Sequence, residues 1–314
     1  MKAPDAAAEA QYRAAMEAGA VADLGGRVLL GLRGADRVRF LNGQVTSDVK
    51  ALGEWTSQPA CLTNAKGRLC AEVRITAVPE AFHLDAEAGL ADALQARLER
   101  YMVADDVALA LLEGMALLHV VGPKARDLNA EWLPGGVHAV TARRFGIDGW
   151  DVWLDTARAG EVLARARSAS VLLDEEVLEA IRVERGVPRW GFELGEDTLP
   201  PEAGLDRTHI DYHKGCYVGQ EVISRIRSVG HVNRSLVGFA ADDGQLLPGM
   251  TLWSPAQPDR PVGSVTSVAW SFALEKPVGL GYLRRGTLVG GLTARLEGSP
   301  PLSVHLRELP QPSP

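Results

Sequence analysis

Residues 213–221, with the sequence HKGCYVGQE, hold the groups of this chain best suited to chemistry. Cys216 lies between two glycines, shortly before a helix predicted to begin at Gly219 or Gln220. A thiol near a helix N-terminus and two residues from Lys214 is expected to have a lowered pKa. The segment therefore predicts a reactive thiol assisted by Lys214, or backbone amides that receive an anion. The alternative is a small buried residue in a tight loop, the usual environment of a free cysteine.

The helices and the loop around this segment are predicted from helix-capping residues, from Gly and Pro, and from the spacing of apolar residues. Asp174 is a suitable N-cap for a helix that Gly186 and Pro188 end near residue 185. A loop rich in Gly and Pro follows, over residues 190–205. In the helix after Gly219, the expected buried side is formed by Val222, Ile226 and Val229.

The N-terminal part alternates helices and strands. A surface helix is predicted over residues 6–22, and strands and helices over residues 27–32, 35–43, 60–63, 69–77, 82–86 and 90–98. The apolar run ending at Gly34 resembles the run ending at Gly122, and both precede a predicted helix. The echo indicates a duplicated α+β half-domain, with coincidence as the alternative.

After Arg234 the pattern changes to short apolar runs separated by Gly, Pro and Asp. They cover residues 236–240, 251–253, 262–268, 278–283, 293–296 and 304–306. Such spacing is typical of a small β-barrel and places a domain boundary near residues 230–235.

Composition excludes several classes of protein. The 314 residues include 33 Lys and Arg against 40 Asp and Glu, a net charge of −7, which disfavours nucleic acid and anionic membranes as general partners. No apolar run is long enough for a membrane span, and the N-terminus lacks a secretory pattern. Three cysteines without CxxC spacing indicate a reducing compartment, so we expect a cytoplasmic protein with no metal site.

The motif KGCYxGQE at residues 214–221 resembles the signature of the YgfZ-type folate-binding proteins. These are relatives of the T-protein, the aminomethyltransferase of the glycine cleavage system, and include iron–sulfur assembly proteins. IRVERGVP (residues 181–188) and LPPEA (199–203) resemble further blocks of the family, as do Gly34 to Asp36, Phe40-Leu41 and residues 46–49. The resemblance covers about residues 25–240.

The resemblance implies an α+β fold, a duplicated folate-binding domain followed by a small C-terminal β-barrel. The implied division is an N-terminal helical extension (1–22), the folate-binding domain (23–232, with halves of about 23–113 and 114–232) and the barrel (233–309). The implied ligand is tetrahydrofolate or a derivative.

Each implied site residue has an alternative interpretation as an ordinary surface or core residue. Glu202, in the LPPEA loop, would bind the donor edge of the pterin; the alternative is a solvated glutamate. Arg225 and Arg227 would take the anionic tail, or lie on a solvated helix face. Tyr217 and Trp190 would line the pterin slot, or pack in the core.

The family's aminomethyltransferases carry two successive aspartates after the hairpin turn. Counting from Gly67 places Cys70 and Ala71 at those positions, with Ala71 replacing the catalytic acid, and Glu72 is expected on the opposite face. The resemblance thus implies a tetrahydrofolate-binding protein that assists assembly or repair of iron–sulfur clusters, with client enzymes or assembly factors as partners. The alternatives are a folate-dependent aminomethyl- or methyltransferase, and a non-catalytic scaffold.

Overall fold

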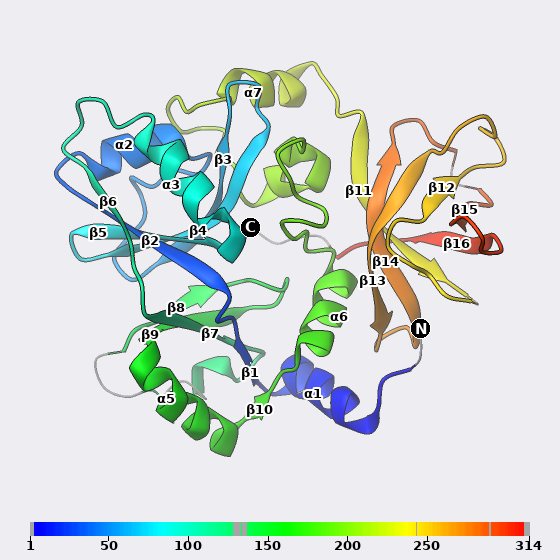
Figure 1. Cartoon of the computed structure of the whole chain (residues 1–314), viewed down its shortest axis with the longest axis horizontal. Helices are drawn as coiled ribbons and strands as arrows, with labels where there is room; N and C mark the ends of the chain where they lie inside the picture. Colours follow the sequence, from blue (N-terminus) through cyan, green and yellow to red (C-terminus); the bar gives the residue numbers. More distant parts are fainter. Residues whose placement is uncertain (1–2, 128–132, 134–136, 243, 289, 311–314) are drawn as a thin grey trace.

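Two α+β halves and a β-barrel are arranged around helix α6 (Glu175–Arg185) (Figure 1). The structure is a computed structural model and describes residues 3–127, 133, 137–242, 244–288 and 290–310. The predicted fold class, an α+β domain followed by a C-terminal barrel, is confirmed.

The first half is a five-stranded antiparallel sheet with two helices. Its strands run in the order β3-β4-β5-β2-β6, and its core combines strand residues such as Leu30 and Ile75 with Phe40 of α2 and Leu94 of α3. The elements are β2 (Arg27–Arg33), α2 (Arg37–Gln44), β3 (Ser57–Thr63), β4 (Leu69–Val78), β5 (Ala81–Glu87), η1 (Ala88–Leu90), α3 (Ala91–Glu99) and β6 (Ala108–Leu111).

The second half is built on another five-stranded sheet, in the order β10-β1-β7-β9-β8. Its elements are β7 (Met115–Val121), β8 (Ala139–Ala142), β9 (Gly149–Asp155), α5 (Thr156–Ala169) and β10 (Val171–Leu172), together with β1 (Ala20–Asp23). Residues 20–22 were expected in a helical extension. Instead the helix α1 (Ala6–Glu17) ends earlier, and Ala20, Val21 and Ala22 are fully buried in a strand between β7 and β10.

The strand–glycine–helix echo corresponds to a geometric repeat. Gly34 and Gly122 follow β2 and β7 with φ of 116° and 110°, a region that favours glycine. A Cβ at Gly34 would lie 2.1 Å from the carbonyl oxygen of Asp106, and one at Gly122 would lie 2.8 Å from that of Ala15. Both turns therefore require a glycine, because the chain passes close to another backbone segment.

Helix α6 joins the halves to the barrel. It follows Asp174 and ends at Gly186, whose φ of 71° fits the predicted glycine stop. Ala180 and Val183 pack against the barrel strands β13 and β14. The Arg182 guanidinium donates to Val187 O at 2.8 Å, which explains an arginine four residues before this glycine.

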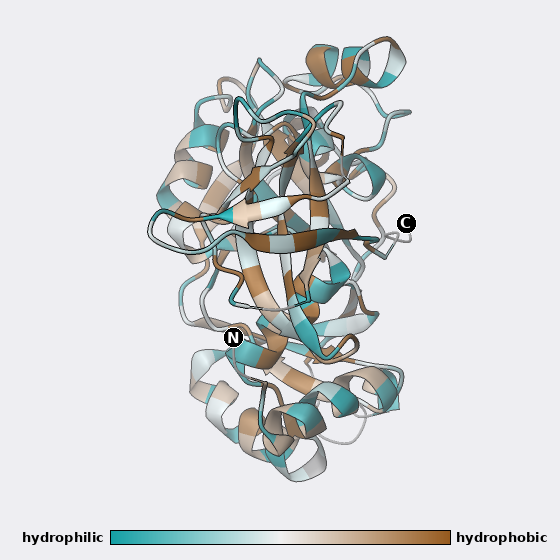
Figure 2. Cartoon of the chain, turned by 90° about the vertical axis from the view of Figure 1, so that its right-hand side faces the viewer, coloured by the Kyte–Doolittle hydropathy of each residue, from teal (hydrophilic) through white to brown (hydrophobic). Residues whose placement is uncertain are grey.

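The barrel closes in the strand order β11-β14-β13-β12-β15-β16. The strands are β11 (Arg234–Ala241), β12 (Thr251–Trp253), β13 (Gly263–Ser271), β14 (Lys276–Arg284), β15 (Thr293–Arg295) and β16 (Leu302–Arg307). Each of the six predicted runs falls on one of them. Figure 2 shows brown, apolar residues alternating with paler ones along these strands, as expected for a closed sheet with one buried face.

Two short helical segments, η2 (Pro200–Ala203) and η3 (Leu205–Arg207), precede the KGCY loop, and α7 (Gln220–Ser228) follows it. The predicted buried side of α7 is wrong in part: Val222 and Ile226 are half-buried, but the fully buried residue is Ile223, and Val229 is 86 % exposed beyond the helix end. Within the described part of the chain, no helix has the length and apolar character needed to cross a membrane.

A buried cluster of charges fastens the two halves together. Arg144, from the loop after β8, donates to Asp85 of β5 at 2.8 Å and to Asp151 of β9 at 2.6 Å. Arg27 of β2 also contacts Asp85, and His119 of β7 contacts Asp151 at 2.8 Å. Burial opposes ionisation of Asp151, but Arg144 and His119 hold its pKa well below the usual range. The contact between the halves therefore includes buried ion pairs.

Replacing Arg144 should destabilise the whole domain. Arg144→Met leaves two buried carboxylates without their shared partner, which typically costs about 3–5 kcal/mol. Urea unfolding followed by circular dichroism measures the loss. Arg165→Met, which removes the exposed pair with Glu161 on α5, is the control and should cost less than about 1 kcal/mol. Equal stabilities of the two variants would show that the halves do not depend on the cluster.

Candidate functional site

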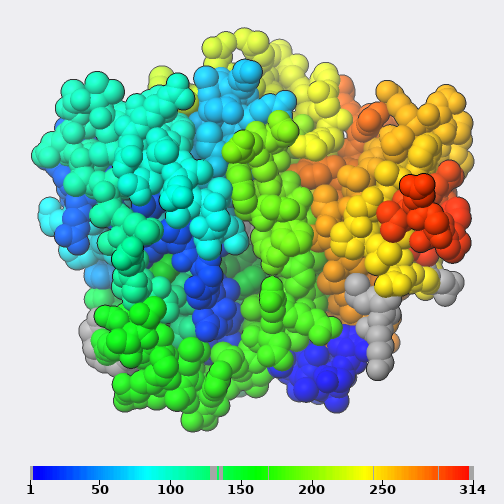
Figure 3. Space-filling view, in the orientation of Figure 1, coloured from blue at the N-terminus to red at the C-terminus, as the bar shows by residue number. Residues whose placement is uncertain are grey.

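A cavity of about 1260 Å³ lies between the two halves, α6 and the barrel. It exceeds the roughly 300–1,000 Å³ of common small-molecule sites, so it has room for a ligand with an extended tail. In Figure 3 the segment after α6, drawn in light green, lies between the blue first half and the orange barrel. The cavity is therefore enclosed by parts of the chain far apart in sequence.

One wall of the cavity is formed by Glu72 and Arg74 of β4 together with His209, and is called the β4 wall here. The His209 Nε2 lies 3.3 Å from the Glu72 Oε1. Burial alone would raise the pKa of Glu72, but His209, Arg27 and Arg74 lower it to about 2. The wall thus presents a fixed carboxylate near neutral pH.

The position of Glu72 adds to the expectation that Ala71 replaces a catalytic acid. Thr63 pairs with Leu69 and Leu62 with Ala71, so Cys70 is the extra residue of a β-bulge. Ala71 packs in the core of the first half, whereas Glu72 faces the cavity. Ala71 and Glu72 point to opposite faces of the sheet, as expected, and Glu72 is on the face that lines the cavity. The cavity therefore retains a carboxylate on this strand.

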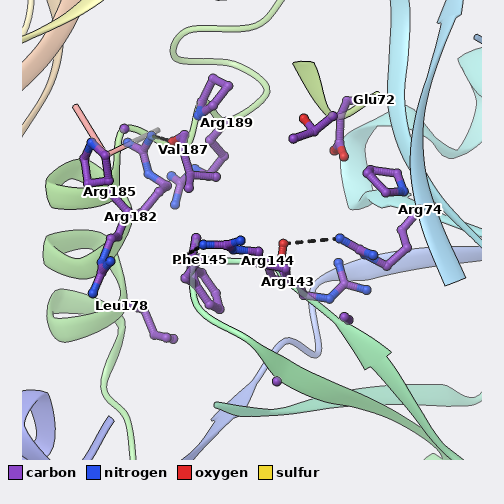
Figure 4. Close-up of a pocket in the computed structure, with 18 of the residues that line it drawn as sticks. Glu72, Arg74, Arg143, Arg144, Phe145, Leu178, Arg182, Arg185, Val187 and Arg189 are labelled. Carbon is purple, nitrogen blue, oxygen red and sulfur yellow. Dashed lines mark hydrogen bonds between the residues drawn. The ribbon is translucent and has the colours of Figure 1, made fainter. Parts of the chain in front are cut away.

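Four more arginines line the cavity, and the backbone of one of them, Arg143, accepts from Arg74 Nη2 at 3.3 Å. Arg143 follows β8, Arg185 ends α6, Arg189 follows α6 and Arg307 ends β16; these four are called the arginine wall. Figure 4 shows Arg182, Arg185 and Arg189 along the α6 side of the cavity, with Glu72 and Arg74 across from them. The cavity therefore has guanidinium groups on both sides, and on the β4 wall they stand beside the carboxylate of Glu72.

Two of the predicted ligand-binding residues lie at or next to the cavity. Trp190 lines it and packs against Cys61 and Leu69. Glu202 is buried on η2, where its Oε2 accepts from Arg234 Nε at 2.9 Å and from Leu199 N at 3.3 Å. Its neighbours Ala203 and Gly204 line the cavity. Among the described residues, no hydrogen bond occupies the Glu202 Oε1.

The three predicted residues of the KGCY loop, at positions 214, 216 and 217, lie in different environments. Cys216 is exposed, whereas Lys214 is buried and its Nζ donates to the carbonyl oxygens of Asn42, Val45 and Ser47 at 2.6–2.7 Å. Burial lowers the pKa of Lys214 to about 8. Its ammonium group therefore anchors the loop to the first half. Tyr217 is buried beneath the loop, and its hydroxyl has no described partner.

The two arginines predicted for the anionic tail lie outside this cavity. Arg225 is exposed on α7 and pairs with Glu221 at 2.8 Å. Arg227 stacks over Tyr212 at 3.9 Å from the ring centroid, in a second hollow of about 890 Å³. Pro59 and Thr208 line both hollows. Sequence reasoning missed Glu72, His209 and the arginine wall. These residues are brought together by a bulge and by loops distant in the chain, which no local sequence pattern predicts. The one local indication is the presence of charged residues in strand β4.

The barrel and the whole chain define the class of protein. Residues 234–300 match the family model of the glycine cleavage T-protein C-terminal barrel domain. The crystal structure of glycine cleavage system aminomethyltransferase T from Bartonella henselae matches with a TM-score of 0.84 at 22 % identity, covering 96 % of this chain and 89 % of that chain. The chain therefore has the T-protein fold.

Proteins of similar sequence indicate which group of proteins with this fold the chain resembles. The chain is 27 % identical over 253 residues to the "tRNA-modifying protein YgfZ" of Yersinia pseudotuberculosis serotype O:1b (strain IP 31758), covering 76 % of this chain and 77 % of the relative. The protein of the same name from Yersinia enterocolitica serotype O:8 / biotype 1B is 27 % identical over 224 residues, 68 % of each chain. The predicted resemblance to the YgfZ-type proteins is confirmed.

The three thiols should react in the order of their exposure. Cys216 is exposed, Cys70 is half-buried and Cys61 is fully buried. Burial also raises the pKa of Cys61 and of Cys70, so fewer thiolates form at these two sites. We expect one fast alkylation by iodoacetamide in the native protein, assigned to Cys216 by peptide mass spectrometry.

The control is Cys216→Ser, which should abolish the fast phase and leave the slow ones unchanged. A fast phase that survives in Cys216→Ser would contradict this order.

Proposed function

We propose that this protein binds a reduced folate in its central cavity and assists assembly or repair of iron–sulfur clusters in client enzymes. The observation that carries the folate part is a cavity that combines the fixed carboxylate of Glu72 with several guanidinium groups. The pterin of a folate offers a flat, donor-rich edge, and its other end carries carboxylates. A cavity with both kinds of group suits such a ligand.

The residues that would hold the head of the folate lie on one side of the cavity. Glu202 would accept hydrogen bonds from the pterin edge through its Oε1, while Arg234 holds the Oε2. Trp190 offers a flat apolar surface nearby. Glu72 belongs to the same side, because η2 and η3 pack on the β3–β4 face through Ala203 and Leu205. These groups supply binding and orientation.

The iron–sulfur part is supported by the family resemblance and by the KGCY loop. Cys216 is exposed at the surface, within reach of a client protein, while Lys214 anchors the loop beneath it. One thiolate cannot hold a cluster alone, since clusters are commonly held by four, so the cluster is cargo shared with the client. The relatives' name concerns tRNA modification. Client enzymes that modify tRNA would connect that name with cluster assembly.

A second candidate, a folate-dependent aminomethyltransferase, is favoured by Glu72, which brings a carboxylate into the cavity. The ionisation of Glu72 argues against it. General acid–base catalysis works best when the pKa lies near the operating pH, and the pKa of Glu72 is about 2. Glu72 is therefore suited to holding a ligand rather than to exchanging a proton with it.

Folate binding can be tested by isothermal titration with tetrahydrofolate. Glu202→Gln removes the charge from the proposed pterin contact and should weaken binding by about 1.5–3 kcal/mol, the range of hydrogen bonds to charged groups. Glu221→Gln, exposed on α7, is the matched control and should bind as the wild type does. Unchanged affinity of Glu202→Gln would remove this residue from the site. A loss confined to Glu72→Gln would place the pterin on the β4 wall.

Deletion of the gene separates the two candidate functions. A cluster-assembly role predicts lowered activity of iron–sulfur enzymes in cell extracts, with growth on glycine as a one-carbon source intact. Complementation by the wild-type gene should restore these activities, and complementation by Cys216→Ser should not. Loss of growth on glycine, with iron–sulfur enzymes unaffected, would favour the transferase.

A further inference from the structure

Thr208, which lines both hollows, begins a chain of hydrogen bonds to which the proposed function gives no role as a whole. The Thr208 Oγ1 lies 2.7 Å from the His209 Nδ1, and the His209 Nε2 lies 3.3 Å from the Glu72 Oε1. A hydroxyl within hydrogen-bonding distance of an imidazole that a third group orients is the arrangement of an activated nucleophile. The three side chains therefore have the order hydroxyl, base and carboxylate.

The ionisation of Glu72 decides which ring nitrogen of His209 carries the proton. Burial opposes ionisation of this carboxyl group, but His209, Arg27 and Arg74 lower its pKa to about 2. An ionised carboxylate only accepts hydrogen bonds, so the His209 Nε2 must be the donor. In the neutral imidazole the Nδ1 is then unprotonated and accepts from the Thr208 hydroxyl.

The same carboxylate stabilises the charge that proton transfer creates. When the Thr208 proton moves to the His209 Nδ1, the ring becomes an imidazolium whose Nε2 still lies 3.3 Å from the Glu72 Oε1. A carboxylate in this position holds the imidazole in one orientation and stabilises the imidazolium. Glu72 thus serves His209 as a fixed negative charge and does not itself have to exchange a proton.

The backbone of His209 is fixed by hydrogen bonds at both of its polar groups. Its N–H donates to Leu205 O at 2.8 Å, and its carbonyl oxygen accepts from the Thr46 Oγ1 at 2.5 Å. Thr46 is fully buried, and the His209 side chain is 13 % exposed. The base is therefore held in place before any substrate binds, which is the condition for efficient reaction between neighbouring groups.

This combination is unusual within the molecule. His119 contacts Asp151 at 2.8 Å and His305 contacts Asp242 at 2.9 Å, so histidine–carboxylate pairs occur elsewhere. In the part of the chain that the structure describes, no hydroxyl other than that of Thr208 is hydrogen-bonded to a histidine ring. Thr208 is also half-buried instead of enclosed, and a substrate in either hollow can reach it.

We propose that Thr208 is a nucleophile that takes an acyl group from an activated ester or thioester, with His209 as its base. Glu72 is the positioning residue that orients this base. The inference goes beyond the proposed folate function and does not depend on it.

The reaction needs only the acyl compound and water. The Thr208 Oγ1 attacks the carbonyl carbon while its proton passes to the His209 Nδ1. The bond from this carbon to the leaving oxygen or sulfur then breaks, and the leaving group takes the proton from Nδ1. Water attacks the acylated Thr208 in the same way and gives a proton to Nδ1. The acid is released, and Oγ1 recovers its proton.

The test uses p-nitrophenyl acetate, with release of p-nitrophenolate followed by stopped-flow absorbance and acetylation located by peptide mass spectrometry. We expect a burst of product and an acetyl group on Thr208 in the wild type. Thr208→Val should abolish both, and Thr208→Ser should retain them because it keeps the hydroxyl. His209→Gln should slow acetylation at this position by about 10²–10⁴-fold, the usual effect of losing a general base.

The pH profile distinguishes a positioning role of Glu72 from a merely structural one. The rate of acetylation at Thr208 should rise with pH as the imidazolium loses its proton. Glu72→Gln removes the charge that stabilises the imidazolium, so the midpoint of this rise should move to lower pH. His305→Gln, which removes the exposed pair with Asp242 on the barrel, is the matched control and should leave rate and midpoint unchanged.

The wild-type protein alone can overturn the proposal, whatever the stability of the variants. Acetylation confined to lysines and the N-terminal amine, with none on Thr208, would show that this hydroxyl is not activated. Acetylation of Thr208 at the same rate in His209→Gln would remove the base from the site. Turnover of p-nitrophenyl phosphate without acetylation of Thr208 would assign the site to phosphoryl groups instead. None of these measurements involves folate, so each result leaves the test of folate binding independent.

Discussion

The arrangement of the two halves depends on one guanidinium, that of Arg144, which joins two buried carboxylates from different halves. Asp85 belongs to the first sheet and Asp151 to the second, and the side chains of both are 1 % exposed. A contact of this kind is directional, unlike apolar packing, because a planar guanidinium can donate to carboxylates in only a few orientations. The charge cluster therefore sets how the two sheets face each other. Arg74 of the β4 wall also contacts the loop that carries Arg143, since its Nη2 donates to Arg143 O at 3.3 Å.

A second polar contact sets the position of the barrel. Glu193, in the segment after α6, accepts from Arg182 and from Thr266 and Ser267 of β13, and Tyr282 of β14 donates to its backbone carbonyl. Helix α6 is thus held in its orientation by polar contacts with the barrel and by apolar packing against α1. Since α6 carries part of the arginine wall, the barrel contributes to the cavity as a rigid support for that helix.

The elements could be predicted from the sequence because their signals are local. Gly34 and Gly122, the Asp174–Gly186 helix and the six barrel runs each depend on residues within a few positions of one another. The cavity could not, because its walls are assembled from loops and strand ends distant in the chain. The direction of Glu72 depends on a bulge, and a one-residue insertion reverses the face of every later residue in a strand. The position of β1 was missed for a related reason, since four apolar residues after a helix resemble its continuation.

The ionisation of the cavity groups separates binding from reaction in this molecule. Glu72 is held ionised by His209, and the guanidinium groups of the arginine wall keep their charge at any physiological pH. A cavity whose carboxylate and guanidinium groups keep their charge near neutral pH is suited to fixing a ligand that has a donor-rich head and an anionic tail. The Glu72 carboxylate is not poised to move a proton. The exposed thiol of Cys216 lies on a loop whose lysine is bound inward to three carbonyls, so the loop presents sulfur to the outside while it stays fixed to the first half. The cavity groups are thus suited to holding a ligand, and the thiol of Cys216 is accessible to a partner at the surface.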